Sequence, residues 1–335
     1  MGRVTLHEVA ARAGVSIKTV SNVVRGYQHV SPRMRERVQA AVDELGYRPN
    51  LRGRNLATGR SGMLALAFPD LRRPYFAELA HVFARVCAER GYRLLLEETG
   101  GTAEGERSVI GDREAGIVDG AIIHPQALTA TELDALRGDT PLVFLGEDEP
   151  PPGADQVAID NVAAADEAVT HLLTTGRHRI GFLGHEVGPL SRSSMLRLEG
   201  YRRALARSGH TPDDSLLVAR EVGDALGAER ALGAALDAGL DVDALLCRED
   251  LAAIGALRAL RVRGIDVPRA VAVVGWDATV LTASTVPTIT SVAPDTRALA
   301  ERAVDLLLAR IAGDDTPPQH VTVEYSLVLR ESAPG

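Results

Sequence analysis

Basic side chains gather at the start of this chain in a way that could neutralise phosphate groups. Residues 1–60 contain eleven Lys or Arg and four Asp or Glu, a balance of +7, whereas the rest of the chain holds 26 and 41, a balance of −15. Such an asymmetry is typical of a protein that meets nucleic acid through one part only. It predicts a nucleic-acid-binding head, which contains the only lysine, Lys18, and a body that avoids phosphate.

Patterns that carry catalysis or hold nucleotide phosphates do not occur. A Walker A loop requires Gly-Lys, and the stretch FPDLRRP after the first apolar run lacks the glycines of GxGxxG. His185-Glu186 is not followed by the second His of HExxH, and no GxSxG is present. Cys87 and Cys247 lie far apart in apolar segments, which favours core residues over a disulfide or a metal pair. We therefore expect no enzyme, no cofactor and no metal site.

The size of the chain suits two or three domains, because 335 residues with 45% hydrophobic content can bury sizeable cores. The opening MGRVTLHEVAARAG lacks the apolar stretch of a signal peptide, and no run is long enough to span a bilayer. We expect a cytoplasmic protein.

Capping and turn residues predict the elements that carry the basic side chains. Thr5 and Glu8 match a capping box, and Gly14 ends the helical spacing that follows. Ser16 can cap a second helix over residues 17–24. Two short helices joined by a glycine turn predict a helix-turn-helix.

A third helix completes this unit. Ser31 with Pro32 can open it, and Gly46 can close it. We predict an all-α helix-turn-helix domain over residues 1–47, followed by a hinge or linker over 48–61.

The sequence of this head resembles one known family. Val4 to Gly26 reads VTLHEVAARAGVSIKTVSNVVRG, and Val30 to Asn50 reads VSPRMRERVQAAVDELGYRPN. Both closely resemble the head of the LacI/GalR family of bacterial transcription repressors. The resemblance implies that the second helix lies in the major groove of operator DNA.

Residues at the start of that helix and one turn further on match the family's base-reading positions. Lys18 can donate to guanine, Asn22 can pair with adenine, and Ile17 can contact a thymine methyl group. The alternative interpretation of these three residues is an ordinary helix face exposed to solvent. The resemblance implies further DNA contacts, to phosphates or in the hinge, for Thr5, Ser16, Thr19, Ser21, Arg25, Asn50 and Arg54.

Residues 48–61 resemble the family's hinge helix, which orders on operator and inserts a leucine into the minor groove. Leu56 matches that leucine, and such a wedge bends the duplex. Gly53 departs from the alanine usual in the family and costs about 1 kcal/mol of helix propensity. An ordinary exposed linker is the alternative.

Apolar runs alternating with helical patterns organise residues 62–335. The first series is MLALAF, YRLLLE, VDGAIIH and PLVFLG, and the second is RIGFLG, DALLC and VAVVGW. Strand–helix alternation predicts an α/β core of doubly wound parallel sheets, and two series predict two lobes. We expect the N-lobe at about 62–160 and 291–320, and the C-lobe at about 161–290 and 321–335.

Landmarks throughout the body extend the family resemblance, which implies a two-lobed core like that of periplasmic sugar-binding proteins. They are Pro69-Asp70, Pro74-Tyr75-Phe76, Val118-Asp119-Gly120, Asp160-Asn161, Gly176 to Ile180, Arg197 to Tyr201, Val273 to Asp277 and Leu329 to Ser332. Ligands of doubly wound sheets sit beyond the carboxyl ends of the strands, so we expect a small molecule between the lobes.

Side chains matching family cleft positions could bind a sugar, which needs planar donors, carboxylate acceptors and an aromatic face. Arg197 is the strongest candidate, because an arginine is costly to bury without a polar partner. Core packing is the alternative for the three aromatic candidates. The full set is Asp70, Arg73, Tyr75, Phe76, His124, Arg197, Glu249, Asp250, Trp276 and Asp277.

Two of these candidates depart from the family pattern. Arg73 and Glu249 each stand where relatives commonly carry asparagine. The departures leave the identity of the sugar undefined and keep a charged or amino-bearing ligand open.

We therefore predict a sequence-specific DNA-binding transcription regulator, in the family a repressor, whose operator affinity a small ligand controls. A homodimer on a pseudo-palindromic operator is expected, because no leucine heptads follow Leu329 to Ser332 to link a tetramer. A sugar-binding transport protein and a nucleoside-responsive regulator of the same fold are the alternatives. The basic head argues against the transport protein.

Overall fold

The computed structural model of the chain describes residues 4–24, 27, 29–47, 60–138 and 140–335. The chain divides into two compact units, residues 1–61 and 62–335, called here the head and the body. The predicted DNA contacts Arg25, Asn50, Arg54 and Leu56, and the hinge residue Gly53, lie outside the described residues.

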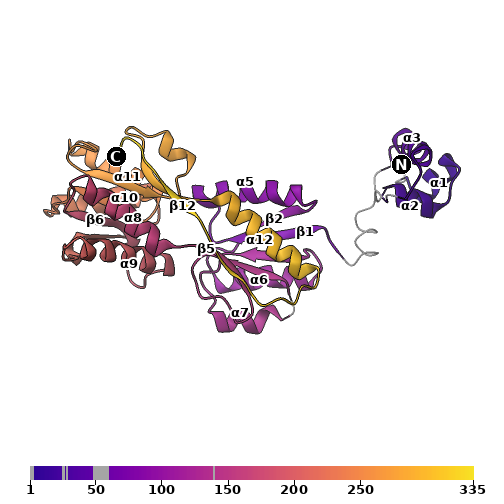
Figure 1. Ribbon diagram of the computed structural model, residues 1–335, viewed down its shortest axis with the longest axis horizontal. Helices are drawn as coiled ribbons and strands as arrows, with labels where there is room; N and C mark the ends of the chain where they lie inside the picture. Colours follow the sequence, from indigo (N-terminus) through magenta and orange to yellow (C-terminus); the bar gives the residue numbers. More distant parts are fainter. Residues whose placement is uncertain (1–3, 25–26, 28, 48–59, 139) are drawn as a thin grey trace. The chain divides into compact units, whose positions relative to one another are not determined.

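Among the described residues of the head, three helices pack around a small core: α1 (Leu6–Ala13), α2 (Ile17–Val24) and α3 (Pro32–Leu45) (Figure 1). The capping box predicted at the start of α1 is confirmed, since the Thr5 side chain accepts from the amide of Glu8, whose carboxylate accepts from the Thr5 amide at 2.7 Å. Gly14 ends α1 with a φ of 62°, a left-handed conformation that glycine adopts without strain.

The N-lobe of the body is built on a parallel six-stranded sheet in the order β11-β5-β4-β3-β1-β2. Helices α5 and α12 cover one face, and α6 and α7 cover the other (Figure 1). The elements are β1 (Met63–Phe68), α5 (Pro74–Glu89), β2 (Arg93–Glu98), α6 (Ala103–Glu114), β3 (Gly120–Ile123), α7 (Ala130–Arg137), β4 (Leu142–Leu145), β5 (Asp155–Ile159), α12 (Thr296–Ile311) and β11 (His320–Val323).

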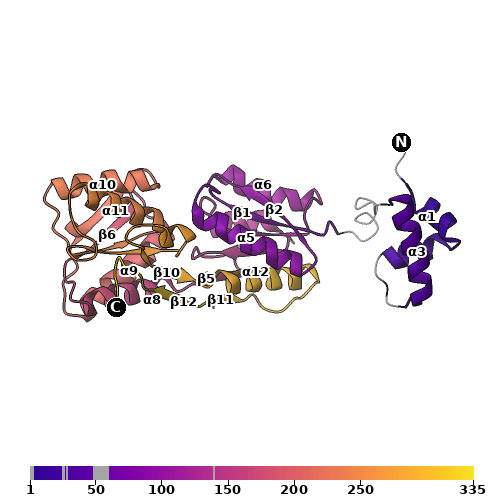
Figure 2. The same cartoon turned by 90° about the horizontal axis from the view of Figure 1, so that it is seen from above.

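The C-lobe repeats this layering on a sheet in the order β12-β10-β9-β8-β6-β7, parallel except for β12 against β10. Helices α8 and α9 cover one face, and α10 and α11 the other (Figure 2). The elements are α8 (Asn161–Thr174), β6 (Ile180–Glu186), α9 (Arg192–Arg207), η1 (Asp214–Leu216), β7 (Leu217–Arg220), α10 (Ala225–Asp237), β8 (Ala244–Cys247), α11 (Asp250–Val262), β9 (Ala272–Trp276), η2 (Val280–Ala283), β10 (Thr290–Pro294) and β12 (Tyr325–Val328). The predicted α/β class with two lobes is confirmed.

The chain crosses between the lobes after β5, after β10 and after β11. Two lobe boundaries therefore differ from the expected ones: β10 belongs to the C-lobe sheet, and β11 belongs to the N-lobe sheet. The difference arises because β10 pairs with β9 of the C-lobe and β11 pairs with β5 of the N-lobe, so the chain crosses only after each of these strands. Asp295 caps α12 immediately after the second crossing by accepting from the amide of Ala298.

Close helix packing in the C-lobe depends on Gly200 of α9. A Cβ atom at this position would lie 2.2 Å from the carbonyl oxygen of Val162 in α8, so only glycine allows the two helices to approach. The neighbouring Tyr201 is buried and donates to the carbonyl of Ile180 at 2.7 Å. This contact places the preceding turn of α9, which carries Arg197, beside the start of α8.

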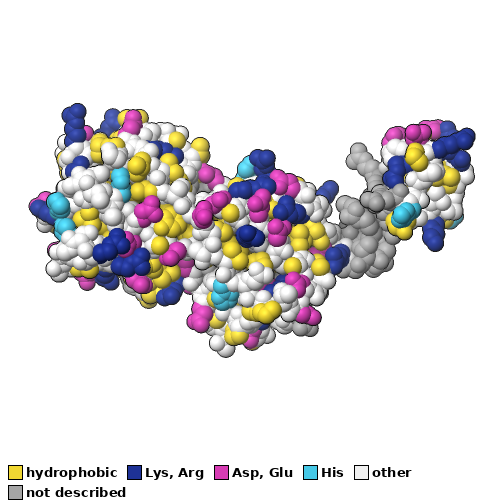
Figure 3. All heavy atoms as spheres, viewed as in Figure 1, with side chains coloured by type: hydrophobic (Ala, Val, Ile, Leu, Met, Phe, Trp, Pro, Cys, Tyr) yellow, Lys and Arg dark blue, Asp and Glu magenta, His cyan; other side chains and the backbone are white. Residues whose placement is uncertain are grey.

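Acidic and basic side chains are interspersed over the visible face of the body (Figure 3). On the N-lobe, Arg90 pairs with Asp305 at 3.0 Å and Arg297 pairs with Glu89 at 2.6 Å, which links α5 to α12. In the part of the chain that the structure describes, no helix is long and apolar enough to cross a membrane.

Candidate functional site

A cavity of about 90 Å³ lies between the two lobes of the body, at the carboxyl ends of their strands. The N-lobe contributes the first turn of α5, the residues after β3 and β4 and the end of β5, and the C-lobe contributes α9 and the turns after β8 and β9. This position is where doubly wound sheets bind ligands. The polar lining residues are Arg73, Tyr75, His124, Gln126, Glu147, Ser193, Arg197, Arg248, Glu249, Asp250, Trp276, Asp277 and Thr279.

Aromatic rings form the N-lobe wall of the cavity. Phe76 is 4% exposed, stacks on Phe68 at 4.8 Å between ring centres, and meets the edge of His124 at 5.4 Å. Burial lowers the pKa of His124, so its ring is neutral near pH 7. Its Nδ1 atom is buried and has no hydrogen-bond partner among the described residues. A ligand in the cavity could supply that partner.

Arg197 and Trp276 form the floor of the C-lobe side. The guanidinium carbon of Arg197 lies 4.1 Å from the centre of the Trp276 ring, a cation–π contact. Arg197 also donates to Asn161 Oδ1 at 2.7 Å and to the carbonyl of Arg248. Trp276 is fully buried, yet its Nε1 atom has no hydrogen-bond partner within the described chain. The arrangement offers a flat apolar face with an indole donor at its edge.

Asp277 follows Trp276 with a φ of 100°, an uncommon conformation that turns the chain sharply at the end of β9. Burial raises the pKa of Asp277 well above its usual range, although the charge of Arg197 opposes this shift. A carboxyl group in this setting can accept hydrogen bonds from ligand hydroxyls when it is ionised.

Asp250 lines the cavity, but neighbouring residues occupy its carboxylate. It accepts from the amide and hydroxyl of Thr279 at 2.7 and 2.9 Å and from the hydroxyl of Ser291 at 2.7 Å. Burial raises the pKa of Asp250 to about 6, and these hydrogen bonds work against the shift. The residue thus holds the loop after β9 in place rather than offering free acceptor atoms.

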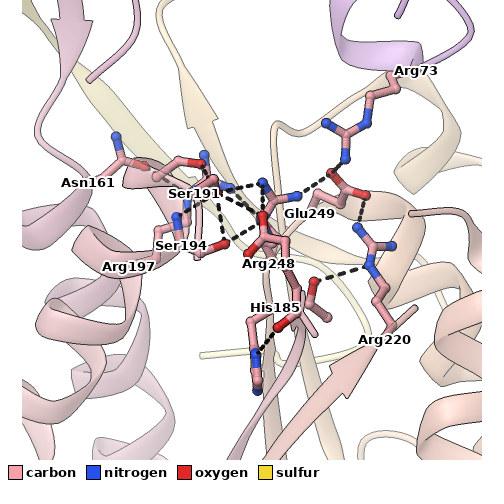
Figure 4. Close-up of polar contacts among 12 residues, drawn as sticks. Arg73, Asn161, His185, Ser191, Ser194, Arg197, Arg220, Arg248 and Glu249 are labelled. Carbon is pink, nitrogen blue, oxygen red and sulfur yellow. Dashed lines mark hydrogen bonds and ion pairs between the residues drawn. The ribbon is translucent and has the colours of Figure 1, made fainter. Parts of the chain in front are cut away.

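Glu249 is the centre of a charge cluster that reaches both lobes (Figure 4). It accepts from Arg73 of the N-lobe at 2.7 Å, from Arg220 at the end of β7, and pairs with Arg248 at 3.3 Å. Burial alone would raise its pKa, but the charges of these three arginines lower the pKa of Glu249 to about 2. The carboxylate is therefore ionised and fully engaged.

Arg248 is 7% exposed, and its side chain forms hydrogen bonds with serine hydroxyls at the start of α9 and in the loop before that helix (Figure 4). Its guanidinium donates to Ser194 Oγ at 2.6 Å and to Ser191 Oγ at 3.1 Å, and it pairs with Glu186 at 2.9 Å. Burial lowers the pKa of Arg248, against the opposing charges of Glu249 and Glu186. These contacts satisfy a buried cation, which would otherwise be costly.

In the head, the side chains at the start of helix α2 are exposed, unlike the buried charged groups of the cleft. Ser16, Ile17 and Lys18 are exposed, whereas Val20 and Val23 are buried against the other helices. Ser16 caps the helix as predicted, because its hydroxyl accepts from the amide of Thr19 at 3.1 Å. The exposed start of α2 is thus free to meet a partner.

Both units match known regulators. Residues 5–50 match the profile of bacterial regulatory proteins of the lacI family, and residues 169–333 match a periplasmic binding protein-like domain. The chain is 35% identical to the HTH-type transcriptional regulator AscG of Escherichia coli K12, over 98% of each chain. It belongs to the lacI family of bacterial regulatory proteins.

Solved structures of family members cover both units. The lac repressor dimer bound to operator and the anti-inducer ONPF is similar with a TM-score of 0.86, 27% identity and full coverage of both chains. The complex of the transcriptional regulator CelR with cellobiose is similar with a TM-score of 0.71 and 30% identity, over 98% of this chain and 100% of that one. This lacI-family member is accordingly a DNA-binding transcription regulator with an effector-binding core.

The structure brings together most of the cleft residues predicted for this lacI-family regulator. Those that line the cavity are Arg73, Tyr75, Phe76, His124, Arg197, Glu249, Asp250, Trp276 and Asp277. Asp70 does not line it. Its carboxylate instead accepts from the guanidinium of Arg72 at 2.9 and 3.0 Å and from the Arg72 amide at 2.9 Å, which holds it in the turn after β1.

Several residues of the cleft escaped the sequence prediction. Arg248 and Glu147 line the cavity, and Arg220 and Asn161 hold lining residues in place. Arg220 ends β7 and Arg248 directly follows β8, so charged residues at strand ends were the available signal. Asn161 donates to Glu147 and accepts from Arg197, which ties a crossing segment to both lobes.

Proposed function

We propose that this lacI-family regulator is a repressor that binds a pseudo-palindromic operator as a homodimer, with a sugar in the cleft controlling operator affinity. The observation that carries the proposal is the stacking of Arg197 on Trp276 inside the cavity, beside the carboxyl group of Asp277. A planar donor, an aromatic face and an acceptor are the groups that sugar recognition requires. The relative CelR has been captured with cellobiose.

The DNA-binding half of the proposal assigns base reading to helix α2. Lys18 donates to guanine, Asn22 pairs with adenine, and Ile17 contacts a thymine methyl group. Thr5, Ser16, Thr19 and Ser21 position the helix on phosphates. The exposure of Ser16 to Lys18 and the positive charge of residues 1–60 support this assignment. The lac repressor dimer provides the parallel for two heads on one operator.

Because Lys18 is the only lysine, an amine-reactive reagent labels a single side chain of the protein. The test is mass-spectrometric footprinting of the full chain with a duplex selected from a random library, and with a scrambled duplex of the same length as control. We expect the selected duplex to protect Lys18 strongly and the scrambled one to protect it weakly. Equal labelling in the two complexes would remove Lys18 from sequence reading.

The ligand half is tested by a thermal-shift screen of sugars and nucleosides on the full chain, since a specific ligand stabilises the folded state by mass action. A sugar that raises the Tm of the wild type, but not of Arg197→Ala, supports the proposal. A shift by nucleosides alone would favour a nucleoside-responsive regulator instead. A melting curve of the unliganded variant shows whether Arg197→Ala still folds.

Coupling between the two halves follows from linkage. A ligand that changes the relation of the lobes changes operator affinity, and the operator changes ligand affinity by the same factor. Since its partner is chromosomal DNA, the regulator acts in the cytoplasm.

A further inference from the structure

The two departures from the family pattern, Arg73 and Glu249, meet each other across the cleft. Arg73 Nη2 of the N-lobe lies 2.7 Å from Glu249 Oε2 of the C-lobe (Figure 4). Near this ion pair, the amide of Val280 in the C-lobe donates to Glu78 of α5 at 2.9 Å. Both contacts join elements that no crossing segment connects directly, so they can form only when the lobes approach.

Both members of the pair occupy helix N-cap positions without capping their own helices. Arg73 precedes α5 and Glu249 precedes α11, and neither side chain makes a capping hydrogen bond. Arginine has no acceptor with which to cap a helix. A glutamate at this position could cap, but Glu249 points toward Arg73 and Arg220 instead (Figure 4). The pair thus uses two helix starts to join the lobes.

The C-lobe holds Glu249 ready for this contact. Arg220, whose side chain is 3% exposed, donates to Glu249 and to the carbonyl of Gly184 at 3.1 Å. Arg248 approaches the same carboxylate from within the C-lobe at 3.3 Å. If the lobes separate, Glu249 keeps both of these partners, while Arg73, whose side chain is 24% exposed, turns to water. Opening therefore leaves no buried charge unpaired and is reversible.

The cavity is small while this ion pair is formed. Its volume is about 90 Å³, whereas sites for small organic ligands usually span roughly 300–1,000 Å³. A sugar therefore needs the lobes to move apart before it can enter. The Arg73–Glu249 contact lies among the lining residues and has to break or shift for that movement.

We propose that the Arg73–Glu249 ion pair is a latch that keeps the cleft closed in the absence of effector. The proposal rests on the proposed function only in naming the cleft as the effector site. Molecules with a closed cleft are unable to bind effector. The latch therefore weakens the apparent effector affinity by the same factor by which it raises the ratio of closed to open molecules. Loss of one partly exposed ion pair should change the opening equilibrium by roughly five- to tenfold.

Trp276 allows the latch to be tested without any effector. It is the only tryptophan of the chain, it lines the cavity, and it is fully buried. Acrylamide quenching of its fluorescence in the full-length protein therefore reports opening of the cleft. The variants are Arg73→Gln, which removes the charge, and Arg73→Glu, which repels Glu249. The matched control is Arg90→Gln, because Arg90 ends the same helix and pairs with Asp305 inside the N-lobe.

We expect the quenching constant to rise about two- to fivefold in Arg73→Gln and further in Arg73→Glu, with no change in Arg90→Gln. High salt should raise quenching in the wild type and leave Arg73→Gln unaffected, because the ion pair is screened. Equal quenching in wild type and Arg73→Gln would overturn the latch. If Arg73→Glu unfolds, shown by circular dichroism, Arg73→Gln alone decides. Failure of the chain to bind a sugar or an operator would not alter these readings, so the two proposals fail separately.

Discussion

Helix α2 of the head and the cleft of the body use polar side chains in opposite ways. In α2 the first residues are exposed, and their arrangement follows from helical periodicity within a single segment. In the cleft, Arg73 and Glu249 meet across 176 positions of sequence, and three arginines bind the Glu249 carboxylate. The comparison teaches that a local pattern predicts which side chains a surface presents, whereas the partners of a buried charge depend on the whole fold.

The strongest way to break this contrast is to remove a buried partner from the cleft. Arg220→Ala should lower the free energy of unfolding of the body by about 3–5 kcal/mol, because a buried ion pair loses its cation and Glu249 keeps only Arg73 and Arg248. Urea unfolding followed by circular dichroism measures the change. Arg202→Ala, which breaks the exposed pair with Asp214 in the same lobe, is the control and should cost less than about 1 kcal/mol. Similar losses in the two variants would contradict the contrast.

A second prediction concerns the pH dependence of the body, to which Asp250 should contribute. Its usual pKa is 3.8, and burial raises it to about 6 in the folded body. Between these values the folded state retains a proton that the unfolded chain has lost, so stability falls as pH rises from about 4 to 6 and then levels off. The expected loss is at most about 3 kcal/mol.

Asp250→Asn tests this assignment, because asparagine does not ionise. Urea unfolding at a series of pH values should show a flatter profile between pH 4 and 6 in the variant, even if its overall stability is lower. Burial also raises the pKa of Asp277, and the charge of Asp250 adds to that shift, so Asp250→Asn loses this coupled contribution as well. An unchanged slope in Asp250→Asn would show that another group produces the dependence.

On the DNA side, Lys18→Ala or Asn22→Ala should weaken binding to the selected operator by about 1–3 kcal/mol and hardly change binding to random DNA. The reason is that base contacts discriminate sequences, whereas phosphate contacts do not. Titrations with both duplexes at fixed salt measure the two affinities. An equal loss on random DNA would assign these residues to phosphate.

The smallest effect tests how locally the head is determined. Thr5→Ala removes a capping box and should destabilise α1 by about 1 kcal/mol, as seen in faster hydrogen exchange of its amides. Thr129→Ala removes the equivalent capping box of α7 in the body and is the matched variant. Each change should act on its own helix and leave quenching of Trp276 unaltered. An effect of Thr5→Ala on the cleft would contradict local determination.

Strand prediction succeeded where apolar residues follow one another without interruption and failed where buried and exposed residues are mixed. The run MLALAF corresponds to β1, which is buried along almost its whole length. β3 and β4 have four residues each and are buried throughout, whereas β5 and β7 alternate between buried and partly buried residues, and β11 and β12 are mostly partly buried or exposed. Such strands depend on neighbours already in the sheet, which a local pattern cannot contain.

The cleft residues, too, were predicted correctly where the strand pattern alone places them and wrongly where the local turn decides. Trp276 and Asp277 stand at the end of an apolar strand, so their place at the cavity could be predicted from the rule for doubly wound sheets. Asp70 also follows a strand, but the turn after β1 pairs it with Arg72 and removes it from the cavity. Turn geometry at single residues is decided by local hydrogen bonds that the strand pattern does not specify.

By itself, the sequence determined the three helices of the head and the two-lobed α/β body, because helical and strand periodicities are properties of short segments. The family resemblance supplied most of the side chains that line the cleft. Only the tertiary structure decided which of those side chains are free. It paired Arg73 with Glu249, occupied Asp250 with Thr279 and Ser291, and left the Nε1 atom of Trp276 buried without a partner among the described residues. The physical reason is that the energy of a buried polar group depends on partners contributed by distant segments, and these meet only when the lobes are assembled.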